Sequence, residues 1–183
     1  MQRVVWRRIS KALVDELIKE ERPLVVILCI GNEERGDDGL GPYVAKKIKK
    51  LSRSNLIKVI DSGTVPENYT GVIRKLKPTH VIIVDAVDFG SSPGDVILSF
   101  EPKFDGVSIS AHKPSLTMLA KYIEKSIGSK VILLGVQPKI LEVDSKMTQE
   151  VLIAGDIIVK ALKSTFRRLL KLKGESLSVS KQT

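Results

Sequence analysis

The sequence predicts an α/β fold, a three-layer α/β/α sandwich built on a mostly parallel five-stranded sheet with one antiparallel strand. Short apolar runs rich in β-branched residues alternate with segments that have the apolar spacing of amphipathic helices, as is typical of parallel sheets covered by helices. The connection at residues 89–94 is the exception, because a parallel crossover needs a dozen or more residues. A chain of 183 residues without internal repeats fits one domain.

The first elements are a helix, a strand and a second helix. An amphipathic helix is expected at residues 3–21, because its apolar residues recur every four positions and Pro23 ends the pattern. Residues 24–30 are seven apolar residues in a row and predict a buried strand. A glycine-rich, acidic loop follows at residues 31–39, and a basic helix is expected at residues 42–51. We expect the first helix to pack on the body of the protein.

The remaining elements follow from the same two patterns. In chain order they are a strand at 56–60, a helix at 66–75, a strand at 81–84, the antiparallel strand at 95–100, a helix at 114–127, a strand at 130–136 and a long helix at 147–171. We therefore expect a single domain over residues 1–183. Residues 1–22 form an additional N-terminal helix, residues 24–162 the core, and residues 172–183 a frayed tail rich in Ser and Lys.

The formal net charge of +9 is unevenly distributed. Residues 160–183 hold seven basic residues and one acid, and residues 1–22 hold six and four, which leaves a body with 17 basic and 16 acidic residues. A basic tail can contact nucleic acid. The tail has no aromatic interleaving of the kind that stacks on bases, so a solvated helix end is favoured and no nucleic-acid partner is expected.

Composition also indicates where in the cell the protein is expected. No apolar run approaches the 18 residues of a membrane-spanning helix, and acidic and basic residues interrupt any signal-peptide pattern near the start. Cys29 is the only cysteine, so no disulfide can form within the chain. We expect a cytoplasmic protein without membrane insertion.

The polar residues of greatest interest follow the parallel strands. Ligands of open α/β sheets bind beyond the carboxyl ends of the strands, and Asp38 and Asp85 follow the first and third expected strands. His112 precedes the helix at 114–127, which must start at the same edge so that the next strand can run parallel. Two carboxylates and one imidazole at one edge suit a divalent metal. The alternatives are an acidic loop that caps the next helix and a surface or helix-capping histidine.

Other arrangements of catalytic residues fit less well. The strand, loop and helix around residues 31–39 have the layout of a phosphate-binding turn, but the loop is net negative and lacks both G-x-G-x-x-G and a Walker lysine. The chain contains no G-x-S-x-G elbow and no H-E-x-x-H motif. Cys29 lies within a buried strand pattern, and His80 opens the third strand at the opposite edge. We interpret both as structural.

Taken together, these residues match a known family. Four pieces carry the match: Gly31-Asn32 with Asp37-Asp38-Gly39-x-Gly41-Pro42; Asp61-Ser62-Gly63-Thr64-x-Pro66-Glu67-Asn68; Val84-Asp85-Ala86-x-Asp88 followed by Pro93-Gly94; and His112 with Gly135-x-Gln137-Pro138 and Met147-Thr148-Gln149. In this order they make the chain resemble the hydrogenase maturation endopeptidases, which process the large subunit of [NiFe]-hydrogenases. The Asp-Asp-Gly form and the Pro-Glu-Asn segment resemble the hydrogenase-3-type subgroup most.

The resemblance implies an α/β/α sandwich and a peptidase that removes the C-terminal extension of a nickel-loaded large-subunit precursor. The family's nickel-binding residues correspond to Asp38, Asp85 and His112, which are expected to be both the metal ligands and the catalytic residues. Gly31, Asn32, Asp61 and Gly63 are candidates for contacts with the substrate. The nickel is expected to arrive with the precursor, because a three-ligand site on an exposed edge would hold it weakly.

Two features depart from the family pattern. The helix at residues 1–22 is additional, which leaves self-association or partner docking through it open. The first loop reads Glu33-Glu34-Arg35, where many members are apolar, so contacts between this loop and the substrate also stay open. A second functional class, a maturation chaperone that senses the nickel centre without cutting, would use the same three ligands. Turnover of a precursor tail separates the two.

Overall fold

The computed structural model describes residues 2–100 and 114–174. Its strands are β1 (Val25–Cys29), β2 (Ile57–Asp61), β3 (His80–Ala86), β4 (Val96–Ser99) and β5 (Lys130–Val136). Its α-helices are α1 (Gln2–Leu17), α2 (Leu40–Ile48), α3 (Thr70–Leu76), α4 (Pro114–Tyr122) and α5 (Gln149–Leu172). Each corresponds to an element expected from the sequence.

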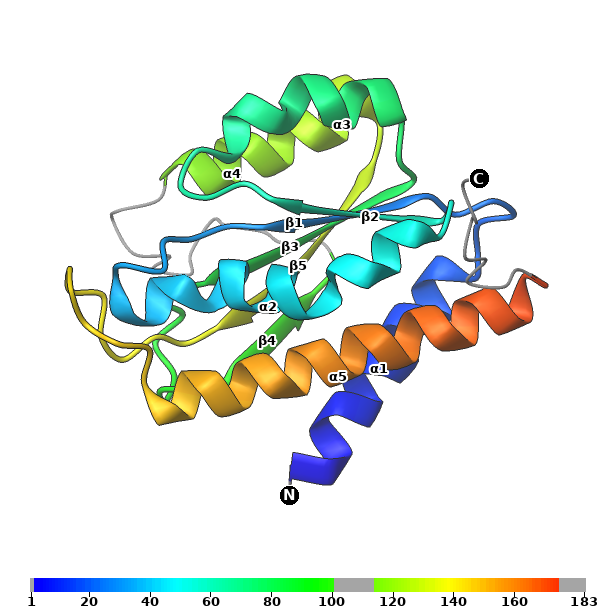
Figure 1. Ribbon diagram of the computed structural model, residues 1–183. Coiled ribbons are helices and arrows are strands. Elements are labelled where there is room, and N and C mark those ends of the chain that lie inside the picture. The colour runs from blue at the N-terminus through cyan, green and yellow to red at the C-terminus, as the bar shows by residue number, and fades with distance from the viewer. Residues whose placement is uncertain (1, 101–113, 175–183) are drawn as a thin grey trace, which may run out of the picture.

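The strands form one sheet in the order β2-β1-β3-β5-β4. Strands β2, β1, β3 and β5 are parallel, and β4 runs antiparallel to β5 with Val96 opposite Val136. Figure 1 shows α3 and α4 on one face of this sheet and α2, α5 and α1 on the other. The predicted three-layer fold with one antiparallel edge strand is confirmed.

Alternate residues of the central strands pack against the two helical layers. On β1, Val25 and Ile27 belong to the core that includes α1, α2 and α5, whereas Val26 and Leu28 belong to the core beneath α3 and α4. All five residues of β1 and all seven of β3 are buried. These strands are covered on both faces, which is why they read as continuous apolar runs.

Helix ends differ most from expectation. Helix α1 stops at Leu17 and not at residue 21, because the chain tightens into turns in which Lys19 N–H donates to Glu16 O and Glu20 N–H to Leu17 O. Four short segments of other helix types adjoin α-helices: the 3-10 helices η1 (Gly36–Gly39), η2 (Lys49–Arg53) and η3 (Pro66–Tyr69), and a π turn η4 (Ile123–Ile127). 3-10 turns are common at helix ends, whereas π turns are rare.

Strand β3 is longer than the expected 81–84 and extends through Ala86. Asp85 is therefore inside the strand, paired in register with Gly135 of β5, and not just beyond the strand end. The reason is that β3 lies between β1 and β5 and keeps its ladder with β5 for two residues beyond Val84. This fixes the backbone of Asp85 within the sheet.

The additional helix α1 packs along α5. Leu13 and Leu17 are fully buried in the same core as Phe166 and Leu162 of α5, so its apolar stripe faces the body of the protein, as expected. At its C-terminal end, Glu16 lies within ion-pair distance of Lys130 at the start of β5. None of the described helices is long and apolar enough to cross a membrane.

Candidate active site

A cleft of about 710 Å³ opens at the carboxyl edge of the parallel strands. It receives residues from the ends of β1 and β3 and from the loops after β2 and β5. Its lining consists of Ile30, Gly31, Asn32, Arg35, Asp38, Thr64, Pro66, Asp85, Ala86, Asp88, Leu116, Leu141 and Glu142. The volume is typical of pockets that enclose a small ligand or a short stretch of peptide. The structure thus brings Asp38 and Asp85 into one cleft, although 46 residues lie between them in the sequence.

Asp85 is fully buried at the base of the cleft. The ladder between β3 and β5 holds its backbone opposite Gly135. Neighbouring β1 ends in register at Cys29 opposite Val84, so the chain that leaves β1 crosses close to Asp85. A carboxylate on a central strand has little freedom to move, which suits a side chain that must meet a ligand in one geometry.

Asp38 lies in the short 3-10 helix η1 (Gly36–Gly39) between β1 and α2. The backbone returns on itself there: Asn32 N–H donates to Asp38 O at 3.0 Å, and Asp38 N–H donates to Arg35 O at 3.1 Å. Gly31 permits this return, because its φ is +146° and a Cβ at this position would lie 1.8 Å from Asp38 O. Gly31 and Asn32 therefore shape the loop that presents Asp38 to the cleft.

The adjacent Asp37 has a different environment, which sequence reasoning missed. Its side chain is fully buried and accepts four hydrogen bonds of 2.7–3.0 Å. The donors are the backbone N–H groups of Lys139, Ile140 and Thr148 and the hydroxyl of Thr148. Asp37 connects η1 to the segment between β5 and α5, and it is not among the residues that line the cleft.

Asp88 is a further acid in the cleft that the prediction left without a role. Its Oδ1 accepts hydrogen bonds from Gly90 N–H at 3.1 Å and from Gln137 Nε2 at 3.0 Å. The buried Gln137 also accepts from Phe89 N–H through its Oε1 at 2.9 Å. Gln137-Pro138, directly after β5, was the feature of the sequence that could have indicated this contact, because it follows a strand that ends at the same edge of the sheet as Asp85.

The predicted site residues divide into three groups. Gly31 and Asn32 line the cleft together with Asp38 and Asp85. Asp61 and Gly63 do not line it; Gly63 O accepts from Gly31 N–H at 2.9 Å, and the next residues, Thr64 and Pro66, reach the cleft instead. His112 lies outside the described residues. The catalytic, metal-binding and substrate-binding roles of these residues stay predictions.

The charge of the cleft is mainly negative. Four of its described lining residues are acids, Asp38, Asp85, Asp88 and Glu142, and Arg35 is the base among them. Within residues 2–100 and 114–174, no three His, Cys, Asp or Glu side chains are grouped closely enough to hold a metal. The described part of the cleft thus supplies a pair of carboxylates that can take part in cation binding or in acid–base chemistry.

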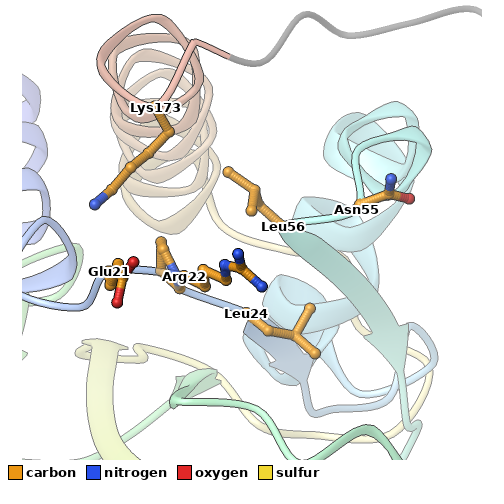
Figure 2. Close-up of a pocket in the computed structure, with 7 residues that line it drawn as sticks. Glu21, Arg22, Leu24, Asn55, Leu56 and Lys173 are labelled. Carbon is orange, nitrogen blue, oxygen red and sulfur yellow. The ribbon is translucent and has the colours of Figure 1, made fainter.

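Figure 2 shows a second cavity, of about 400 Å³, at the opposite edge of the sheet. It is lined by residues that precede β1 and β2 and by the end of α5: Glu21, Arg22, Pro23, Leu24, Asn55, Leu56 and Lys173. Glu21 is the acid in this set, and no histidine or cysteine joins it. This cavity lacks the paired carboxylates of the first cleft.

Cys29 and His80 have structural environments. Cys29 is fully buried in β1, and burial, with a smaller contribution from the charge of Asp61, raises the pKa of its thiol far above the ordinary value. A thiol that stays protonated is a poor nucleophile. His80 is fully buried at the start of β3, at the edge away from the cleft. Cys29 thus lies in the core and His80 at the opposite edge, as the sequence predicted.

Comparison with known proteins gives one consistent family. The family model described as hydrogenase maturation protease matches residues 42–165. The hydrogenase 3 maturation protease of Escherichia coli strain K12 is 38% identical over 138 residues, which cover 75% of this chain and 87% of that protein.

Solved structures agree with this family. A crystal structure of a [NiFe] hydrogenase maturation protease, HycI from Thermococcus kodakarensis, superimposes with a TM-score of 0.70 at 31% identity and covers 81% of this chain and 97% of that one. The solution structure of an endopeptidase HycI from Escherichia coli gives a TM-score of 0.65 at 34% identity, with coverage of 87% and 99%.

Proposed function

Because the chain belongs to the hydrogenase maturation proteases, which are peptidases, we propose that it removes the C-terminal extension of a [NiFe]-hydrogenase large-subunit precursor. The observation that supports this proposal most is the shared cleft of Asp38 and Asp85 at the carboxyl edge of the sheet. A cleft of about 710 Å³ has room for a short stretch of peptide beside the two carboxylates.

We further propose that the enzyme recognises nickel carried by the precursor. The precursor's cysteines hold the nickel, and Asp38, Asp85 and His112 complete its coordination. Carboxylate and imidazole groups are suitable ligands for such a metal. This contact would place the scissile peptide bond at one position in the cleft, so that loading with nickel gates cleavage.

Hydrolysis then needs an activated water. Either the nickel or a cleft carboxylate acting as general base lowers the barrier for attack on the peptide carbonyl carbon. The C–N bond breaks, the water supplies the hydroxyl of the new carboxyl group, and its proton reaches the leaving amine. Asp85 is fixed within β3 and Asp38 within η1, so neither backbone has to rearrange when the substrate arrives.

The test is cleavage of the nickel-loaded precursor, followed by the intact mass of the large subunit. We expect loss of a C-terminal peptide with wild-type protein, and at least about a 100-fold slower loss with Asp38→Asn and with Asp85→Asn. Full activity in either variant would contradict the site assignment. Tight binding of the wild type to the precursor without any change of mass would instead favour the chaperone function.

A further inference from the structure

The connection between β5 and α5 contains a loop, residues 139–147, that has neither helix nor strand but is firmly attached to η1 and the residues before it. Three backbone hydrogen bonds join the two segments: Asp144 N–H to Glu34 O at 2.8 Å, Gly36 N–H to Ser145 O at 3.1 Å, and Asp37 N–H to Ile140 O at 2.9 Å. Arg35 Nη2 adds a bond to Leu141 O at 3.2 Å. Loop 139–147 is therefore held in one position.

Gly36 allows the two segments to touch. Its φ is +54°, and a Cβ at this position would lie 2.5 Å from Ser145 Oγ and 2.7 Å from Ile140 O. Both distances are too short for a side chain, so the contact requires glycine. Loop 139–147 and η1 behave as a single packed unit.

Asp37 fixes the same unit from the inside. Its buried carboxylate accepts from Lys139 and Ile140 at the start of the loop and from Thr148 just after its end. Asp38, the next residue, lines the cleft. Any movement of loop 139–147 against Asp38 would break these bonds, so Asp37 couples the two.

The side chains that the loop presents suit contact with a peptide. Leu141 and Glu142 line the cleft, and the next residue, Val143, is 64% exposed. Across β1 and β3, the loop after β2 exposes Val65, 45% accessible, between the lining residues Thr64 and Pro66. Single exposed apolar residues are ordinary, but each of these two is next in sequence to residues that line the cleft. A rigid surface loses little entropy on binding.

We propose that loop 139–147 is the wall of the cleft that recognises the precursor chain beside the scissile bond. Leu141 and Val143 contact an apolar side chain of the precursor, and Asp37 is the positioning residue that keeps this wall in register with Asp38. The inference rests on the proposed function, because it assigns the substrate-recognition part of that same site.

The first test compares Val143→Asp with a matched control, Val72→Asp. Val72 is also exposed, at 47%, but it lies on α3, and neither Val72 nor its neighbours in sequence line the cleft, whereas Val143 directly follows the lining residue Glu142. We expect Val143→Asp to raise KM for the nickel-loaded precursor about tenfold with kcat changed less than about twofold, and Val72→Asp to change neither. A wild-type KM in Val143→Asp, or an equal rise of KM in both variants, would overturn the proposal that loop 139–147 recognises the precursor.

The second test addresses Asp37 through Asp37→Asn, which keeps the shape but replaces an acceptor oxygen with an NH₂ group facing donors. Kinetics are measured at a temperature at which circular dichroism shows the variant to be folded. We expect kcat to fall at least about tenfold together with a rise in KM, in contrast to the change in KM alone for Val143→Asp. Wild-type kcat and KM in the folded variant would show that Asp37 only stabilises the fold and would overturn its positioning role.

Failure of the proposed function gives a different result. If the wild type leaves the precursor intact, the peptidase proposal fails. The role of loop 139–147 in recognition is then tested by the Kd for binding of the uncleaved, nickel-loaded precursor to each variant. About tenfold weaker binding by Val143→Asp than by Val72→Asp would support the wall, and equal Kd values would overturn it.

Discussion

Asp37 and Asp38 are neighbours in the chain but face different surroundings. Both belong to η1, a 3-10 helix, in which successive side chains point about 120° apart because there are about three residues per turn. Asp37 is fully buried against the segment after β5, whereas Asp38 lines the cleft. One turn of helix thus supports a structural carboxylate and a candidate catalytic one.

Loss of the Asp37 carboxylate should destabilise the fold. Asp37→Ala leaves the N–H groups of Lys139, Ile140 and Thr148 without their acceptor, and buried unpaired donors are costly. We expect the free energy of unfolding to fall by about 2–4 kcal/mol in urea denaturation. Asp38→Asn, an isosteric change in a half-buried cleft residue, is the control and should cost less than about 1 kcal/mol. Equal losses in the two variants would contradict the division of roles.

The sequence could not separate these two acids. Both stand in the same glycine-rich loop, and pattern and spacing treat them alike. The distinction comes from Thr148, 111 residues further along the chain, whose N–H and hydroxyl both reach Asp37. Topology placed this loop at the carboxyl edge of the sheet, and the family resemblance then assigned Asp38 as a ligand. Neither argument gave the separate environment of Asp37, which only the folded chain reveals.

His80 should make stability depend on pH. Burial, with the nearby charge of Lys130, lowers the pKa of its imidazole, and Glu16 opposes this shift. A lowered pKa means that the folded state binds the proton less tightly than the unfolded chain, whose histidine titrates near pH 6.5. The stabilisation is complete above about pH 6.5 and declines as the pH falls below it, by at most about 1.4 kcal/mol per pH unit.

The measurement for His80 is the free energy of unfolding of the wild type and of His80→Asn between pH 7.5 and pH 5. The difference in slope matters here, not the absolute stability, since the substitution also changes packing. We expect the wild type to lose stability more steeply than the variant on acidification. Parallel curves would show that folding does not lower the pKa of His80. A wild type that gains stability on acidification, as Glu16 pairs with a protonated His80, would show that the shift has the opposite sign.

At the scale of elements, the strands were predicted more closely than the helix ends. Strand β5 has the expected bounds, Lys130–Val136, and β4 is antiparallel, as the short link at residues 89–94 required. Apolar runs between charged or glycine-rich residues define strands well. Helix ends depend on tertiary contacts: the hydroxyl of Thr148, which precedes α5 as its N-cap, bonds to Asp37 and does not cap the helix.

Helix α1 should contribute to stability through its buried stripe. Leu13 is fully buried against the core that contains α5, and a cavity left by Leu13→Ala should lower the free energy of unfolding by about 2–5 kcal/mol. Val4, on the same helix, is 57% exposed, so Val4→Ala is the matched control and should change stability by less than about 0.5 kcal/mol. A Leu13→Ala variant as stable as the wild type would mean that α1 is not docked in solution.

At the scale of the whole molecule, topology is what made the cleft predictable. Parallel strands end at one edge, so Asp38 and Asp85 had to approach each other wherever the helices began or ended. The walls of the cleft were not predictable in the same way, because Leu141, Glu142 and Thr64 come from loops without a periodic pattern. Their positions depend on hydrogen bonds between segments distant in sequence.

The most direct measurement compares cleavage of nickel-loaded and nickel-free precursor in parallel, with the intact mass of the large subunit as the readout. If Asp38 and Asp85 bind the nickel of the precursor, the wild type removes the C-terminal peptide from the loaded form at least about 100-fold faster than from the nickel-free form. The Asp38→Asn variant then removes the peptide from neither form. Equal rates on the two forms would contradict recognition through nickel, and unchanged cleavage by Asp38→Asn would contradict the site itself.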